Sequence, residues 1–104
     1  MKRGEIWWAE LGPPAGRRPV VLLSRDDAYN VRSLVVIAPV TTRIRNIASE
    51  VLLGQPDGLP QECAANLDTI TTIPKDCLRN RLSILSNQKL KELEEAIRFA
   101  LGME

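Results

Sequence analysis

The chain has 104 residues, of which 44% are hydrophobic, and its formal net charge is +1 at pH 7. This size predicts one compact domain over residues 1–104, which can bury a core without disulfides or a structural metal. The chain contains no histidine, which excludes a histidine acid/base pair, a Ser–His or Cys–His dyad and a histidine-ligated zinc site.

Short strands separated by turn signals are predicted for the first part of the chain. Residues 5–11 read EIWWAEL, an aromatic-rich strand, whereas residues 12–19 form a loop because they include three prolines and two glycines. Two continuous apolar runs, residues 20–24 and 34–42, predict strands that are buried on both faces. The segment between them, residues 25–33, has the composition of a connector.

The second part of the chain continues in the same way before its composition changes near the end. Residues 43–49 are polar and predict a loop. Short strands are expected in residues 50–54 and 62–74, separated by the turn-rich residues 55–61. Residues 81–85, RLSIL, alternate polar and apolar side chains, which is typical of a half-exposed strand.

A helix is predicted over the tail, residues 86–102. Ser86 suits its N-cap and Gly102 its left-handed C-terminal cap. One apolar stripe runs along this helix, formed by Leu90, Leu93, Ile97 and Leu101. The expected fold is therefore mainly β with a C-terminal α-helix, in which about five to seven short strands form a small barrel-like sheet against which the helix packs.

The two cysteines and the amino terminus indicate where the protein works. Cys63 and Cys77 show neither C-x-x-C spacing nor a second pair, so we expect two free thiols in a reducing cytosol. Residues 1–8 lack the apolar region of a signal peptide, and no apolar run approaches membrane length. We therefore expect a cytoplasmic protein with no membrane partner, no metal and no other cofactor.

Arginine is concentrated between residues 17 and 45. This stretch holds six arginines against two aspartates, a local excess of four positive charges that would attract phosphate groups. The alternative is an ordinary solvated surface.

Arginine and threonine residues stand at the ends of the two predicted buried strands. Arg17 and Arg18 precede the first strand, and Thr41 and Thr42 end the second. If these strands are neighbours, an arginine and a threonine hydroxyl meet at a loop-rich rim. The guanidinium fork can then bind two phosphate oxygens while the hydroxyl donates a third bond.

Such a site is suited to RNA cleavage without a metal, because the 2′-hydroxyl of the RNA is the nucleophile. The protein must hold that oxygen in line and stabilise the charge that builds on the phosphoryl oxygens. Arginine serves the second task but is a poor base, since it stays protonated. The alternatives are that Arg18 forms a structural salt bridge to Glu10 or Asp68, and that Thr41 is a plain strand residue.

Several blocks of the sequence together resemble the MazF/PemK (Kid) toxin family. In chain order these blocks are RGEIWWAELGPP, GRRPVVLLS, APVT, LDTITTIPKD and RLSILS, which cover nearly the whole chain. The resemblance implies a homodimer with an SH3-like barrel that cuts single-stranded RNA at short motifs, leaving a 2′,3′-cyclic phosphate and a 5′-hydroxyl. It also implies a toxin, acting on mRNA, that is neutralised by an acidic antitoxin protein filling the RNA groove.

The resemblance also assigns roles to individual residues. The catalytic arginine before the proline of the GRRP block corresponds to Arg18, and the hydroxyl that ends the PVT strand corresponds to Thr41. RNA-binding candidates come from both halves of the chain: Arg17 and Thr42, then Arg43 and Arg45 for the backbone phosphates, and Asn66, Asp68 and Thr69 for the bases. Trp7 and Trp8 should point to opposite faces of their strand.

The chain departs from the family pattern at two places. Only Ala15 and Gly16 separate GPP from RRP, where many members carry a longer loop with a Ser-Glu-Gln stretch, and Thr69 stands where a glutamine is common.

Two alternative functions stay open. One is a gyrase poison like CcdB, although this chain lacks the C-terminal tryptophan of that family; the other is an inert binder of RNA or antitoxin.

Overall fold

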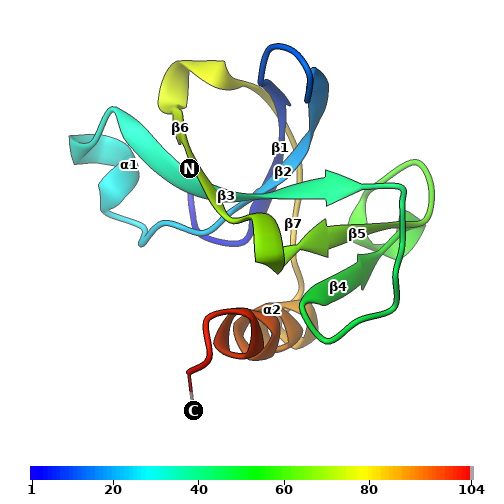
Figure 1. Cartoon of the computed structure of the whole chain (residues 1–104). Coiled ribbons are helices and arrows are strands. Elements are labelled where there is room, and N and C mark those ends of the chain that lie inside the picture. The colour runs from blue at the N-terminus through cyan, green and yellow to red at the C-terminus, as the bar shows by residue number, and fades with distance from the viewer. Residues whose placement is uncertain (104) are drawn as a thin grey trace.

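Strand β3 (Leu34–Thr41) lies in the middle of the sheet, because both of its edges are paired. One edge pairs with β2 (Arg17–Leu22). The other edge pairs with β6 (Thr71–Pro74) near the start of β3 and with β5 (Cys63–Asn66) near its end. The computed structural model describes residues 1–103, and Figure 1 shows β3 crossing the centre of the molecule.

Three more antiparallel strands complete the sheet. They are β1 (Glu5–Glu10), β4 (Glu50–Leu53) and β7 (Leu78–Ile84). The strand order is β4-β5-β3-β2-β1-β7, with β6 beside β3. Seven strands in a curled antiparallel sheet and a C-terminal helix, α2 (Asn87–Ala100), confirm the predicted fold class.

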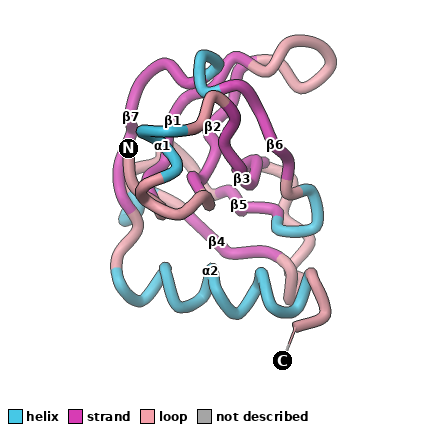
Figure 2. Tube along the Cα trace, turned by 90° about the vertical axis from the view of Figure 1, so that its left-hand side faces the viewer, coloured by secondary structure: helices cyan, strands magenta, loops and turns pink. Residues whose placement is uncertain are grey.

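The sheet buries apolar side chains on both faces. Ile6 and Val21 belong to the cluster between the sheet and α2, in which Leu93 of α2 is fully buried. Val20 and Leu22 point to the opposite face and belong to a second cluster. Because neighbouring residues of one strand point to opposite faces, the continuous apolar run of β2 supplies both cores. In Figures 1 and 2 α2 lies beneath β4, on one side of the sheet.

The two ends of α2 are capped as the sequence predicts. The Ser86 hydroxyl accepts a hydrogen bond from the backbone N–H of Lys89 at 3.2 Å. Gly102 follows the helix with φ of 68°, and the backbone N–H of Met103 donates to the carbonyl of Arg98 at 2.7 Å. This left-handed glycine satisfies carbonyl groups that the last helical turn leaves without partners.

Several elements differ from the prediction. Strand β2 begins at Arg17, inside the predicted loop, and β7 begins at Leu78, ahead of the predicted residues 81–85. The expected connector contains a short helix, α1 (Ala28–Val31). The short strands expected in residues 62–74 are β5 and β6, and a 3-10 turn, η2 (Leu67–Thr69), separates them. The Asn66 side chain accepts from the backbone of Asp68 and so favours this turn over extended backbone. Two further 3-10 turns, η1 (Gln55–Asp57) and η3 (Lys75–Cys77), lie near β5 and β7.

Both cysteines are free, as expected. Cys63 is buried and Cys77 is half-buried. Burial raises the pKa of the Cys63 thiol, which disfavours the reactive thiolate. Across residues 1–103, neither helix has the length and apolar character that crossing a membrane requires.

The phenol of Tyr29 gives the fold a predicted sensitivity to alkali. Its hydroxyl donates to the carbonyl of Ser24 at 3.1 Å, and burial raises the pKa of Tyr29 from 10.0 to about 12. Between these values the unfolded chain has released the phenolic proton and the folded chain has kept it, so stability falls as pH rises. Tyr29→Phe should therefore be less stable by about 1 kcal/mol at neutral pH, with a difference that vanishes or reverses as pH approaches about 12.

Urea unfolding of both proteins from neutral to alkaline pH measures this difference. Other titrating groups change the stability of both proteins alike, so the comparison isolates Tyr29. Parallel stability curves for the two proteins across the alkaline range would contradict the assignment.

Candidate functional site

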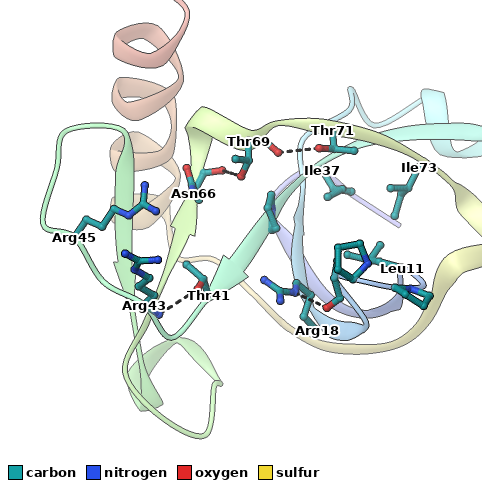
Figure 3. Close-up of a pocket in the computed structure, with 14 residues that line it drawn as sticks. Leu11, Arg18, Ile37, Thr41, Arg43, Arg45, Asn66, Thr69, Thr71 and Ile73 are labelled. Carbon is teal, nitrogen blue, oxygen red and sulfur yellow. Dashed lines mark hydrogen bonds between the residues drawn. The ribbon is translucent and has the colours of Figure 1, made fainter.

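A cavity of about 580 Å³ opens on the face of the sheet opposite α2, at the end of β3 where the loops converge. Figure 3 shows that its side chains come from strands and loops that are far apart in the sequence. The lining consists of Leu11, Pro13, Pro14, Ala15, Arg18, Ile37, Pro39, Thr41, Arg43, Arg45, Asn66, Thr69, Thr71 and Ile73. Six of the nine predicted site residues are among them.

Strand β3 forms the floor of the cavity. Ile37, Pro39 and Thr41 all line it, and residues two apart in a strand share a face. Ile37 is buried in the core cluster beneath the floor, whereas Thr41 at the end of the strand is partly exposed. Along this row of side chains the floor changes from a buried apolar residue, Ile37, to an accessible hydroxyl, that of Thr41.

Strand β2 decides which of the two adjacent arginines faces the cavity. Arg18 has the same parity as Val20 and Leu22, which pack into the core on that side of the sheet. The pairing of the two strands ends where Val20 lies opposite Pro39, and Arg18 and Thr41 lie beyond this pair on their respective strands. The strand pairing that the sequence argument required is present, and it places these two side chains on one cavity.

The guanidinium of Arg18 keeps most of its donors for a ligand. Its Nε donates to the carbonyl of Ala15 at 3.1 Å. In residues 1–103 it has no ion pair: Glu10 lies 3.8 Å from Arg17 instead, and Asp68 accepts from Ser49. The structural salt bridge that was the alternative explanation for Arg18 is therefore not formed, and its two terminal nitrogens can take an anion.

The Thr41 hydroxyl is oriented by the chain that follows it. Its Oγ1 accepts a hydrogen bond from the backbone N–H of Arg43 at 3.1 Å. Since the oxygen is the acceptor in this bond, the hydroxyl proton stays available to donate into the cavity. In Figure 3, Thr41 lies between Arg43 on one side and Arg18 on the other.

A carboxylate outside the cavity holds the loop that carries Arg43 and Arg45. Glu50 Oε1 accepts from the backbone N–H groups of both Arg45 and Asn46 at 3.0 Å. Asn46 adopts the left-handed conformation with φ of 56°, which asparagine tolerates better than most residues. The loop turns sharply there, and both arginines line the cavity.

The wall opposite Arg18 is polar and comes from β5, η2 and β6. Asn66 and Thr69 line it together with Thr71. The hydroxyl of Thr69 donates to the carbonyl of Asn66 at 3.3 Å, and the hydroxyl of Thr71 donates to the carbonyl of Thr69 at 2.9 Å. These local bonds hold the turn in shape beside the cavity.

Three predicted site residues lie outside the cavity. The guanidinium of Arg17 sits 4.9 Å from the centroid of the Trp8 ring and 3.8 Å from Glu10, on the other side of β2. Thr42 follows Thr41 but borders a separate small pocket of about 90 Å³. Asp68 does not line the cavity and is bonded to Ser49.

The tryptophans divide between the two faces as expected. Trp7 packs against the second core cluster, and its ring N–H donates to Glu5 at 2.9 Å. Trp8 lies on the opposite side, under Arg17.

The prolines of the loop before β2 line the cavity, although no pattern in the sequence marks them as site residues. Pro13 and Pro14 form one side with Leu11, and Thr71 closes the far wall. Ile37 and Pro39 could have been predicted as lining residues, because alternate residues of a strand share a face and both alternate with Thr41. No such rule applies to Pro13 and Pro14, which lie in a loop.

The chemistry of the lining is cationic and hydroxylic. It contains three arginines and three threonines, and no carboxylate, lysine or thiol among the described residues. Within residues 1–103 no group of three or more Cys, Asp or Glu side chains is placed to hold a metal ion. Three fixed positive charges with free donors on a concave surface are suited to a polyanion.

Comparison with known proteins gives consistent matches across the chain. Residues 2–101 match the family model described as PemK-like, MazF-like toxin of type II toxin-antitoxin system. The chain is 42% identical to the Mycobacterium tuberculosis protein "Probable endoribonuclease MazF5", over 95% of this chain and 91% of that protein.

Solved structures agree with the sequence relatives. The Mycobacterium tuberculosis toxin MazF-mt6 superposes with a TM-score of 0.89 at 31% identity, covering 96% of this chain and 98% of that one. A mycobacterial endoribonuclease in complex with its cognate antitoxin superposes with a TM-score of 0.88 at 28% identity, covering 100% of this chain and 97% of that one. None of these three relatives is named as a gyrase poison.

The cavity arginines should make binding to a polyanion depend on salt. Arg43→Ala and Arg45→Ala should each weaken binding to a single-stranded oligonucleotide and lower the slope of log affinity against log salt by about 0.7 for each phosphate that the variant no longer binds. Arg25→Ala is the matched control, because Arg25 is an exposed arginine paired with Asp27 away from the cavity. Fluorescence anisotropy over a salt series measures the slope, and equal losses for all three variants would contradict the site.

Proposed function

Since the chain belongs to the PemK-like, MazF-like toxins of type II toxin–antitoxin systems and is an endoribonuclease of that family, we propose that its arginine-lined cavity binds and cuts single-stranded RNA. The observation that carries this proposal is the convergence of Arg18 and Thr41, each with an unused donor, on one concave surface. The cut is specific for a short sequence, needs no metal and falls on mRNA, which makes the protein an inhibitor of growth.

The chemistry assigned to Arg18 is stabilisation of charge. As the phosphorus gains a fifth oxygen, negative charge builds on the two non-bridging oxygens, and a planar guanidinium can bond both at once. The bond from Arg18 Nε to the Ala15 carbonyl fixes the orientation of the guanidinium before the RNA arrives. Donors that are already oriented need no rearrangement during the reaction, which is the condition for large electrostatic catalysis.

Thr41 adds a neutral donor from the adjacent strand. Its hydroxyl accepts from the Arg43 backbone and therefore directs its proton away from that bond, toward the scissile phosphate. This bond places the phosphate in line for attack, and positioning of this kind lowers the entropic part of the barrier.

The nucleophile is the 2′-hydroxyl of the RNA. Its oxygen bonds to the adjacent phosphorus as the bond from phosphorus to the 5′-oxygen breaks, leaving a 2′,3′-cyclic phosphate and a 5′-hydroxyl. The 2′-proton passes to solvent and the leaving oxygen takes a proton back, so the overall proton balance is zero. Because the described lining has no carboxylate, the protein contributes positioning and charge stabilisation.

The remaining cavity residues bind the strand on either side of the cut. Arg43 and Arg45 contact backbone phosphates, a contribution that does not depend on sequence. Asn66 and Thr69 lie across the cavity from Arg18 and read an unstacked base through hydrogen bonds.

The same cavity is the proposed point of inhibition. An antitoxin is the partner of this toxin, and a mycobacterial relative has been solved in complex with its own. An acidic segment can pair with Arg18, Arg43 and Arg45 and thereby exclude RNA. We also propose that the toxin is a homodimer and acts in the cytoplasm, where its RNA substrate is found.

Adjacent arginines provide a matched test of catalysis. Arg18→Ala should abolish cleavage of a long single-stranded RNA in excess EDTA, whereas Arg17→Ala, with the same loss of charge on the other face of β2, should cut at nearly the wild-type rate. Thr41→Ala should cut about 10- to 100-fold more slowly, because it removes one neutral donor to a charged group. Sequencing the new ends and identifying their chemistry gives the rate and the products.

Thermal unfolding of each variant is the control. Arg18 makes one side-chain hydrogen bond to the part of the protein that the structure describes, so Arg18→Ala should stay folded. Unfolding of this variant would show that Arg18 is structural. Wild-type cleavage that requires added metal, or equal loss in Arg17→Ala and Arg18→Ala, would refute the mechanism.

A further inference from the structure

The amide of Asn66 is oriented by a bond to the backbone that follows it. Its Oδ1 accepts the backbone N–H of Asp68 at 2.9 Å. A backbone N–H can only donate, so the oxygen must face it, and the two hydrogens of Nδ2 are left for a ligand. Asn66 lines the cavity, and its contribution there is therefore that of a hydrogen-bond donor.

Asp68 and Ser49 hold the turn in which Asn66 is oriented. The hydroxyl of Ser49, only 1% exposed, donates to Asp68 Oδ2 at 2.5 Å. The carbonyl of Ser49 accepts the backbone N–H of Leu67 at 2.9 Å. A side-chain bond and a backbone bond thus tie η2 to the residue that precedes β4. The Asp68 carboxylate is engaged outside the cavity, so Asp68 acts through Asn66 and does not contact a base.

A donor in this position distinguishes the bases by their exocyclic groups. Uracil and guanine carry a carbonyl oxygen at position 4 or 6, whereas cytosine and adenine carry an amino group there. The Nδ2 donor can bond the carbonyl, but it meets the amino group as donor against donor. An asparagine free to offer both its oxygen and its nitrogen would read adenine by a bidentate pair. The bond to Asp68 occupies one lone pair of this oxygen and turns it toward the backbone, which disfavours that pair.

We propose that the Asn66 side of the cavity is a subsite for a keto base, uracil or guanine, an inference that rests on the proposed RNA cleavage. Ser49 and Asp68 are the positioning residues that give the subsite this selectivity. The cleavage motif of the enzyme therefore contains one position at which uracil or guanine is required. Mutation of Asp68 relaxes that position without removing the charge stabilisation that Arg18 provides.

The inverting variant is Asn66→Asp. One carboxylate oxygen still accepts the Asp68 N–H, and the other now offers an acceptor where Nδ2 offered a donor. An RNA pool with randomised sequence is cleaved and the new ends are mapped. At the position where the wild type requires uracil or guanine, Asn66→Asp should instead prefer cytosine or adenine by about 10-fold. An unchanged motif in Asn66→Asp, or a wild-type motif that contains neither uracil nor guanine, overturns the proposal.

The positioning role is tested by two variants of one residue. Asp68→Asn keeps an oxygen that can accept from Ser49 and should retain the wild-type motif, whereas Asp68→Ala should lose the preference at the keto position while still cutting. A purely structural role would instead lower the cleavage rate at all sites alike and leave the base preference unchanged. Equal behaviour of Asp68→Asn and Asp68→Ala would refute the role of the Ser49 bond.

Binding separates this inference from the proposed function. Arg18→Ala, used as a protein that does not cut, is titrated with short RNAs that differ only by uracil against cytosine at the selected position. Tighter binding of the uracil RNA, reversed when Asn66→Asp is added, supports the subsite even if the wild type fails to cleave. Cleavage by the wild type with no preference in either assay leaves the ribonuclease proposal intact and rejects the keto subsite.

Discussion

The antiparallel pairing of β2 with β3 is the constraint on which the rest of the site depends. Val20 lies opposite Pro39, and Arg18 and Thr41 lie beyond this pair, where both line the cavity. A slip of one residue would turn Arg18 to the other face and bring Arg17 in its place. In the observed register Val20 and Leu22 pack into the core on the same side as Arg18, and Val21 packs on the other side. This register determines which arginine meets the ligand.

The cavity concentrates positive charge that the protein does not neutralise. Arg17 has Glu10 and the ring of Trp8 beside it, and Arg25 has Asp27. Arg18, by contrast, is bonded within residues 1–103 to a backbone carbonyl alone, which fixes its direction without cancelling its charge. Glu50 likewise orders the loop of Arg43 and Arg45 through backbone N–H groups. Acidic groups in this site support the backbone, and the guanidinium groups are left for an external anion.

Part of the site was predictable because its residues stand at strand ends in the sequence. Arg18 and Thr41 flank two apolar runs, and their convergence required only that these runs be neighbours. Asn66 and Thr69 were also named from the sequence as candidates, and the structure places both in the cavity lining. Asp68 was named with them because it shares their segment, yet its carboxylate is bonded to Ser49. No spacing rule relates Ser49 to Asp68, since they meet only through the pairing of β4 with β5.

The sequence alone determined the fold class, the capped C-terminal helix and the concentration of arginine in the first half of the chain. These follow from local patterns: apolar runs broken by proline and glycine, an apolar stripe between Ser86 and Gly102, and the order of charged residues. Only the tertiary structure decided which face each arginine occupies and which end of the Asn66 amide is exposed. Both faces of β2 are apolar. The alternation of residues along the strand therefore shows that Arg17 and Arg18 point to opposite faces, but it does not show which face carries the cavity. That side is defined when α2 packs on one face of the sheet and leaves the other for the cavity.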